Sequence, residues 1–283
     1  MTEQMTESLF IYNERSGGCD PKLVAEVENL FAQSRWPLGG TRMMGEDDLP
    51  DVQAANEQGL GLIVVLSGDG SLSAVAQALS GWEGTLLALP GGTMNLLARA
   101  LHGELSVIEI VQAYLDGRGT VLRTPIIQAG EITAYTGLIA GPTAAWGEVR
   151  EALRNRDLAA LADEIPHALT ATFEEPGVAL AGEDTTYPAI FVEPGVRGLR
   201  SYGVLANSAG DLFRHGWAWL SGDFRDGPAE PLGTAASIRL YSDSETLDLL
   251  VDGERAKSTS PLDLRAARSA VRFFAAQGEA AWT

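Results

Sequence analysis

The amino-acid sequence predicts two regions of different fold class, an α/β region over residues 1–125 and a β-rich region over residues 126–283. Up to Pro125, short apolar runs alternate with helix-type patterns, which is typical of strands joined by right-handed crossovers in a largely parallel sheet. Beyond Pro125, short β-like runs dominate and predict a mostly antiparallel β-sandwich. Glycine-rich turns that directly follow apolar runs are the third observation, because open α/β sheets bind ligands at the carboxyl ends of their strands.

In the first region, a helix is predicted after Asp20, an N-cap residue followed by proline at the first helical position. Apolar residues then recur at spacings of three and four on one helix face. The strands are expected at residues 9–12, 62–66 and 86–89, with a weaker strand at 41–44. Further helices are expected near residues 49–58, after Ser71, from Asn95 to about Leu101, and over residues 106–115.

In the second region, the β-like runs cover residues 126–128, 134–138, 168–173, 189–192, 237–241 and 247–251. A helix is expected near residues 143–153, with residues 157–164 as its continuation.

The composition excludes several classes of protein. A formal net charge of −18 argues against a nucleic-acid surface and against firm adhesion to anionic membranes. Cys19 is the single cysteine, so no internal disulfide forms and a reducing compartment is expected. No apolar run of about 18 residues is present, and the acidic N-terminus is unlike a secretory signal. We therefore expect a soluble cytoplasmic protein.

The turn Ser67-Gly68-Asp69-Gly70-Ser71 follows the apolar run 62–66. Glycine lets the backbone approach a phosphate closely, and the start of the following helix supplies N–H groups and partial positive charge. Asp69 would repel a phosphate, so it is expected to hold Mg²⁺ or its water shell, or to accept a proton. An ordinary Asp-Gly turn is the structural alternative.

A second turn, Pro90-Gly91-Gly92-Thr93-Met94-Asn95, follows the apolar run 86–89. Thr93 offers a hydroxyl, and Asn95 can cap its helix or bind a ligand. No lysine lies in either turn, which excludes a P-loop, and no dinucleotide-type G-x-G-x-x-G is present. Two such turns in succession, one with a carboxylate, predict a polyphosphate site with a metal.

The sequence resembles the diacylglycerol kinase catalytic-domain family and its bacterial lipid-kinase relatives, including sphingosine kinase-like members. Residues 67–71 resemble the GGDGT signature that diacylglycerol, sphingosine and NAD kinases share with phosphofructokinases. Residues 89–99 look like the more specific LPxGTxNxxAR segment. Asn13 with Gly17-Gly18 resembles the NPxSG turn, although Glu14 replaces the proline, and Asp252-Gly253-Glu254 resembles a DGE turn.

This resemblance implies an NAD kinase/diacylglycerol kinase-like fold and an ATP-dependent, Mg²⁺-requiring lipid kinase. It implies that Asp69 organises the metal and that Glu254 accepts the proton of the lipid hydroxyl. The expected nucleotide-binding residues are Asn13, Ser67, Gly68, Asp69, Gly70, Ser71, Gly92, Thr93 and Asn95. The expected partner is a lipid substrate met by transient membrane contact; no nucleic acid is expected, and a homodimer is compatible with the sequence.

Residues 205–212 depart from the family pattern. Bacterial members carry an Asp-x-x-Asp-Gly-type magnesium segment in this region, and here only Asp211 matches as a metal ligand. This difference keeps open a catalytically impaired nucleotide- or lipid-binding protein on the same scaffold. An NAD kinase-like small-molecule kinase is the other alternative. His102, His167 and His215 show no metal-binding spacing and are expected to be ordinary surface or core residues.

Overall fold

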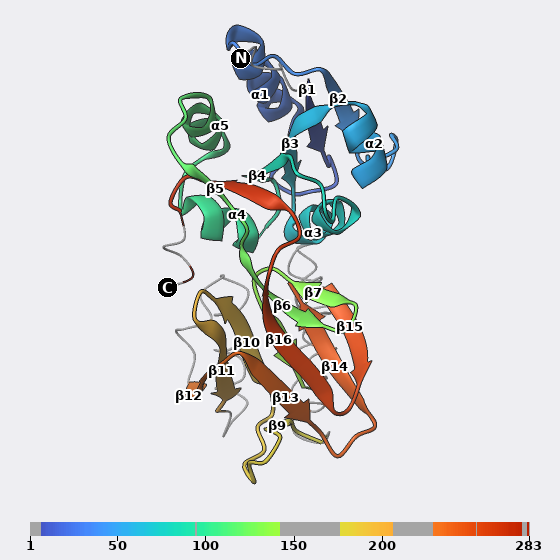
Figure 1. Ribbon diagram of the computed structural model, residues 1–283, viewed down its shortest axis with the longest axis vertical. Coiled ribbons are helices and arrows are strands. Elements are labelled where there is room, and N and C mark those ends of the chain that lie inside the picture. Colours follow the sequence, from blue (N-terminus) through green and yellow to red (C-terminus); the bar gives the residue numbers. More distant parts are fainter. Residues whose placement is uncertain are drawn as a thin grey trace, which may run out of the picture. The chain divides into compact units, whose positions relative to one another are not determined.

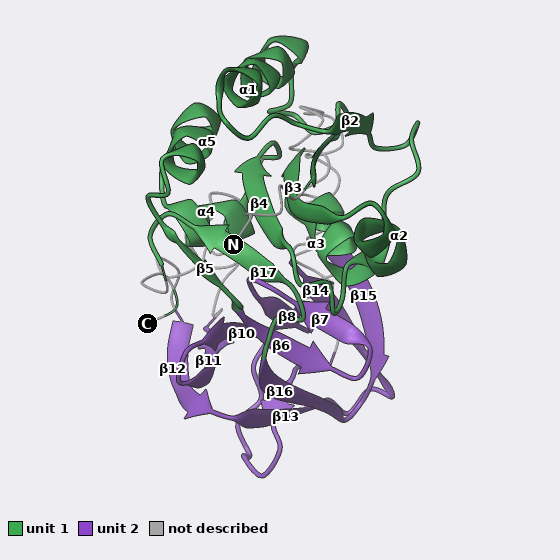
Figure 2. Cartoon of the chain, turned by 45° about the horizontal axis from the view of Figure 1, so that its top comes forward, with its two compact units in different colours: residues 1–124, 268–283 green, residues 125–267 purple. Residues whose placement is uncertain are grey.

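The computed structural model describes residues 7–93, 95–141, 176–205, 229–252, 254–278 and 282. The chain forms two compact units (Figure 2), unit 1 from residues 1–124 and 268–283 and unit 2 from residues 125–267.

Unit 1 contains a six-stranded sheet with the strand order β2-β1-β3-β4-β17-β5 (Figure 1). All described pairs are parallel except β17–β5, which is antiparallel. The strands are β1 (Glu7–Tyr12), β2 (Gly40–Met43), β3 (Leu60–Ser67), β4 (Thr85–Pro90), β5 (Thr120–Leu122) and β17 (Arg272–Ala275). The predicted α/β class with a largely parallel sheet is therefore confirmed.

The helices of unit 1 are α1 (Pro21–Gln33), α2 (Val52–Glu57), α3 (Asp69–Ala78), α4 (Leu96–His102) and α5 (Val107–Leu115). Helix α1 begins where the sequence predicts, since the Asp20 carboxylate accepts the N–H groups of Lys22 and Leu23 at 2.8 and 3.0 Å. Apolar residues of α1 and α5 form one core with alternate residues of β3 and β4. Because the intervening residues of β3 and β4 are also buried, these strands are apolar on both faces, as in a covered parallel sheet.

The C-terminal segment departs from the predicted organisation. Residues 268–283, which the sequence interpretation assigned to the second region, fold with unit 1. Strand β17 lies between β4 and β5, where the Phe273 side chain is fully buried and Phe274 is nearly so. A four-residue strand with three apolar residues does not indicate which sheet it joins, so only the folded structure shows that this segment returns to unit 1.

Unit 2 contains two sheets with the orders β12-β11-β10-β8-β14-β15 and β7-β6-β16-β13-β9. One apolar core includes residues of both sheets. The strand pairs other than β6–β16 are antiparallel, so the predicted β-sandwich is confirmed. The strands are β6 (Pro125–Ala129), β7 (Ile132–Ala134), β8 (Leu138–Ala140), β9 (Ala179–Leu180), β10 (Ile190–Gly195), β11 (Gly198–Val204), β12 (Ala229–Ala235), β13 (Ser237–Tyr241), β14 (Thr246–Val251), β15 (Glu254–Thr259) and β16 (Leu262–Arg268).

One predicted strand of unit 2 is wrong in detail. The run 134–138 is not a single strand, because β7 ends at Ala134 and β8 begins at Leu138. The residues between them bind the side chain of Asp252 instead of a neighbouring strand. The predicted helices at 143–153 and 157–164 and the run 168–173 lie outside the described residues. Within the described part of the chain, no helix is long and apolar enough to cross a membrane.

His102 fastens the C-terminal segment to the rest of unit 1. The ring is fully buried, with its Nε2 3.0 Å from the carbonyl oxygen of Ala88 and its Nδ1 3.4 Å from the amide nitrogen of Ala276. A neutral ring that donates from Nε2 and accepts at Nδ1 satisfies both partners. Burial lowers the pKa of His102 to about 4, against the opposing effect of the Ala88 carbonyl. His102 is thus a core residue, consistent with its lack of metal-binding spacing.

The buried His102 predicts a loss of stability in mild acid. Between pH 6.5 and 4, His102 is protonated in the unfolded chain but stays neutral in the folded chain. The free energy of unfolding therefore falls as the pH is lowered through this range. The full effect is on the order of 3 kcal/mol. Urea unfolding at several pH values should show a shallower decline for His102→Gln, which keeps a donor for Ala88, than for the wild type. Identical declines would contradict this assignment.

Candidate active site of unit 1

Three turns follow neighbouring parallel strands of unit 1. Turn 1 (residues 13–18) follows β1, turn 2 (residues 67–71) lies at the end of β3, and turn 3 (residues 90–95) follows β4. Since β3 pairs in parallel with both β1 and β4, the three turns share the carboxyl edge of the sheet. This edge is where open α/β sheets bind ligands.

Hydrogen bonds connect the three turns to one another. From turn 1, the Asn13 side-chain amide donates to the Ser71 hydroxyl at 2.9 Å, and the Ser16 hydroxyl accepts the Gly68 N–H at 3.2 Å. Turn 3 is joined to both others, because Gly18 N–H donates to Gly91 O at 2.9 Å and Gly91 N–H donates to Ser67 O at 3.0 Å. The turns therefore form one connected backbone structure.

Two glycines of turn 3 are required by its contact with turn 2. A Cβ on Gly92 would lie 2.6 Å from the Cα of Gly68, and a Cβ on Gly91 would lie 2.8 Å from the backbone nitrogen of Ser67. Both distances are shorter than real Cβ contacts, and both neighbours are backbone atoms that cannot rotate away. By contrast, a Cβ on Gly17 would find only the Thr93 hydroxyl, at 4.0 Å. Gly91 and Gly92 thus serve the packing of the turns, whereas the space around Gly17 stays open.

Helix α3 begins within turn 2 and supplies N–H groups to this edge. Its N-cap is Gly68, which has no side chain to cap the helix, and its first intrahelical bond runs from Leu72 N–H to Gly68 O. The N–H groups at the start of a helix lack intrahelical partners and carry the partial positive charge of the helix dipole. This start of α3 is therefore suited to bind a phosphate group.

Asp69 is buried at the first position of α3 and contacts the start of a second helix. One of its carboxylate oxygens accepts the N–H of Leu97 at 3.1 Å, in the first turn of α4. The N-cap residue of α4, Asn95, makes no capping bond with its own side chain, so Asp69 takes over this role. The positive end of α4 offsets part of the negative charge of Asp69. Asp69 is thereby held in one place at the edge that carries the turns.

Asn95 closes turn 3 upon itself. Its side-chain oxygen accepts the Gly92 N–H at 2.6 Å, and its side-chain nitrogen donates to Gly92 O at 2.9 Å. The backbone of Asn95 is left-handed, with φ of 53°, a conformation that asparagine tolerates better than most residues. Of the two roles open to Asn95 from the sequence, helix capping by its side chain is not observed.

The donor atoms at this edge fit a magnesium ion held jointly with phosphate groups. In the part of the chain that the structure describes, no group of three or more histidine, cysteine or acidic side chains is arranged to hold a metal ion by itself. Mg²⁺ in phosphate-transferring sites commonly uses one or two carboxylates, with phosphate oxygens and water as its other ligands. Asp69 supplies one such carboxylate. The hydroxyl groups of Ser71 in the same turn and of Thr93 in turn 3 are further oxygen atoms at this edge. The second predicted metal ligand, Asp211, lies outside the described residues.

The structure thus gathers every predicted nucleotide-binding residue of unit 1 in the three turns. Ser16 was not assigned a role from the sequence, and its bond to Gly68 could not be read from turn composition alone. Glu254, the predicted proton acceptor, is exposed at the start of β15 in unit 2. Its neighbour Asp252 is buried.

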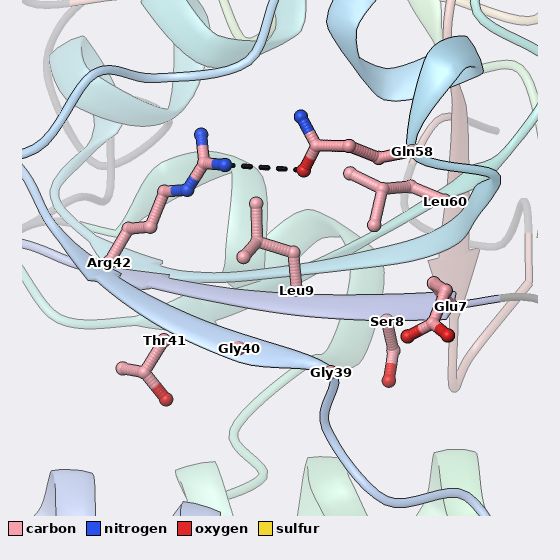
Figure 3. Close-up of a pocket in the computed structure, with 9 residues that line it drawn as sticks. All are labelled: Glu7, Ser8, Leu9, Gly39, Gly40, Thr41, Arg42, Gln58 and Leu60. Carbon is pink, nitrogen blue, oxygen red and sulfur yellow. Dashed lines mark hydrogen bonds between the residues drawn. The ribbon is translucent and has the colours of Figure 1, made fainter.

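A cavity of about 350 Å³ lies elsewhere in unit 1, beside the amino ends of β1, β2 and β3 (Figure 3). Its lining includes Glu7, Gly40 and Leu60, which begin these three strands, and Arg42, which donates to the Gln58 side chain at 3.2 Å. Because the turns occupy the carboxyl ends of the same parallel strands, this cavity is at the opposite edge of the sheet from them.

The packing of the turns predicts opposite outcomes for two glycine substitutions. Gly92→Ala should destabilise unit 1 by about 1–3 kcal/mol, because the new methyl group meets the backbone of Gly68. Gly17→Ala should leave the free energy of unfolding within about 1 kcal/mol of the wild type, since its methyl group enters open space. Urea unfolding of both variants measures the difference. Equal losses of stability would show that the turns are not in contact as described.

Comparison with known proteins places these turns in a family context. Residues 7–124 match the family described as the diacylglycerol kinase catalytic domain. A diacylglycerol kinase from Bacillus anthracis str. Sterne has a similar structure, with a TM-score of 0.65, 17% identity and coverage of 95% of this chain and 96% of that chain. Yeast NADH kinase complexed with NADH gives a TM-score of 0.53 at 10% identity and covers 99% of this chain and 86% of that chain.

At these identities the two structures establish a common fold. No curated protein matches the sequence. The match covers α1 to α5 and all three turns, so the resemblance of this chain to the diacylglycerol kinase catalytic-domain family is confirmed over residues 7–124.

Proposed function

We propose that the chain is an ATP-dependent lipid kinase that phosphorylates the hydroxyl group of a diacylglycerol-like lipid. The match of residues 7–124 to the diacylglycerol kinase catalytic domain supports a kinase that acts on a lipid or another small molecule. The observation that carries the proposal is that this matched segment contains three turns joined into one structure at the carboxyl edge of the sheet. The identity of the acceptor is the part that goes beyond the family match.

In the proposed site, the start of α3 and the backbone of the turns bind the phosphates of ATP. The turns contain no lysine, so backbone N–H groups replace the cationic side chain that a P-loop would use. Asp69 would hold Mg²⁺ together with the phosphates, and the ion would neutralise negative charge on them. The contact of Asp69 with α4 keeps its carboxylate in place for this purpose.

The proposed reaction is a single displacement at the γ-phosphorus. The lipid hydroxyl oxygen forms a bond to this phosphorus, the bond between the phosphorus and the β,γ-bridging oxygen breaks, and ADP leaves with that electron pair. Glu254 is the proposed acceptor of the hydroxyl proton, a role that rests on the resemblance of residues 252–254 to the DGE turn. The products are ADP and a phosphorylated lipid.

The proposal includes a cytoplasmic location and brief contact with membranes that contain the lipid. A net charge of −18 disfavours lasting adhesion to an anionic surface, because basic residues provide that attraction. An NAD kinase-like activity is the second candidate, which the structural similarity to yeast NADH kinase favours.

The acceptor can be identified with ATP labelled at the γ-phosphate and offered with diacylglycerol micelles, sphingoid bases or NAD. We expect label in phosphorylated diacylglycerol, and label in NADP instead would contradict the lipid assignment.

Asp69→Asn should lower the transfer rate by a factor on the order of 10²–10³, because it removes the negative charge of the carboxylate. The asparagine oxygen can still accept the Leu97 N–H, so the melting temperature should stay near that of the wild type. Asp69→Ala removes the cap as well and should also lose about 1 kcal/mol of stability.

A further inference from the structure

Asp252 occupies an unusual position for a residue in a strand-to-strand turn. It follows the last residue of β14, and Glu254, two residues later, is the first residue of β15. Asp-Gly turns between antiparallel strands commonly lie in solvent, where their polar side chains are hydrated. The Asp252 side chain is instead buried, with 5% of the residue exposed, and its backbone is left-handed with φ of 49°.

The carboxylate of Asp252 binds three consecutive residues between β7 and β8. One oxygen accepts the Tyr135 N–H at 2.9 Å. The other accepts the Thr136 N–H at 2.7 Å, the Thr136 hydroxyl at 2.8 Å and the Gly137 N–H at 3.2 Å. In return, the N–H of Asp252 donates to Gly137 O at 3.0 Å. We call this set of five hydrogen bonds the Asp252 clamp.

The clamp requires a carboxylate. The four described groups that bind the Asp252 side chain are all donors, and they are divided between its two oxygens. An asparagine would turn an NH₂ group toward at least one of these donors, which leaves that donor unsatisfied in a buried place. Burial raises the pKa of Asp252 above its ordinary value, and the donated hydrogen bonds offset only part of this rise. Burial, and secondly the charge of Asp252, raises the pKa of the neighbouring Tyr135 phenol.

The neighbouring strands extend the clamp to the backbone of Glu254. Val251, which precedes Asp252, pairs with Glu254 of β15 on one side and with Leu138 of β8 on the other. Gly137 packs closely against this sheet, since a Cβ there would lie 2.7 Å from the ring of Phe191. Contacts within unit 2 therefore hold the start of β15 in place.

From this geometry we infer that Asp252 is a positioning residue, which holds the backbone that carries Glu254 through its bonds to Tyr135, Thr136 and Gly137. The inference rests on the proposed function, because it takes Glu254 as the proton acceptor. In this role, Asp252 neither accepts nor donates a proton during the reaction. It restricts where the Glu254 carboxylate can lie, and small displacements of a catalytic group are costly for rate.

The test compares transfer kinetics of Asp252→Asn, Glu254→Gln and the double variant. Asp252→Asn should lower kcat about ten- to a hundred-fold while the KM for ATP stays within about twofold. Because Asp252 acts through Glu254, the double variant should be no slower than Glu254→Gln alone. The matched control is Asp263→Asn, which should keep the wild-type kcat. This variant also loses one negative charge, but from an exposed ion pair between Asp263 in β16 and Arg239 in the neighbouring strand β13.

Hydrogen exchange supplies a readout that does not depend on activity. In Asp252→Asn, exchange should accelerate in residues 135–138 and 251–255 but not in β16. If Asp252→Asn does not fold, Thr136→Val, which removes one donor of the clamp, should give the same pattern with a loss in kcat of about two- to fivefold. Wild-type kcat in Asp252→Asn, with a strongly reduced kcat in Glu254→Gln, would overturn the inference and leave the proposed function standing. Full activity of Glu254→Gln would remove the proposed base and the inference with it.

Discussion

The close approach of two backbone turns is the constraint on which the site in unit 1 depends. Gly92 packs against the Cα of Gly68 so closely that no side chain fits between them. This contact brings the ends of β3 and β4 together, and the bonds from Ser16 and Gly18 add the end of β1. The N–H groups at the start of α3 are thereby presented on a framework of fixed backbone. A phosphate group binding there would meet donors that need no rearrangement, which lowers the entropic cost of binding.

The charges at this edge follow from the absence of lysine in the turns. The exposed Arg15 of turn 1 is the one cationic side chain in the turns, so the framework relies largely on backbone dipoles, and its buried carboxylate must be kept from repelling phosphate. Helix α4 meets this need in part, because the Leu97 N–H binds Asp69 and the helix dipole opposes its charge. A divalent cation shared between Asp69 and the phosphates would complete the neutralisation. The same residue thus links the stability of α4 to the proposed chemistry.

The sequence predicts local features well and distant contacts poorly. The three turns, the helix start at Asp20 and both fold classes follow from patterns within a few residues, where strand period and glycine placement are visible. The insertion of β17 between β4 and β5 depends on contacts between residues that lie 187 positions apart in the sequence, such as Arg272 and Thr85. Likewise, Asp252 resembles a common turn residue in the sequence. Only the structure shows that its side chain is buried and accepts hydrogen bonds from the N–H groups of residues 135–137. Asn95 closes its own turn because of its left-handed backbone, which composition does not reveal.

The central claim is that the three turns together bind the phosphates of ATP. Amide nitrogen–proton NMR spectra of the full chain, recorded during titration with ATP and Mg²⁺, test this claim residue by residue. We expect the largest shifts at Gly17, Gly68, Gly70 and Thr93. Shifts centred on Gly39, Gly40 and Thr41, beside the cavity at the opposite edge of the sheet, would contradict the account.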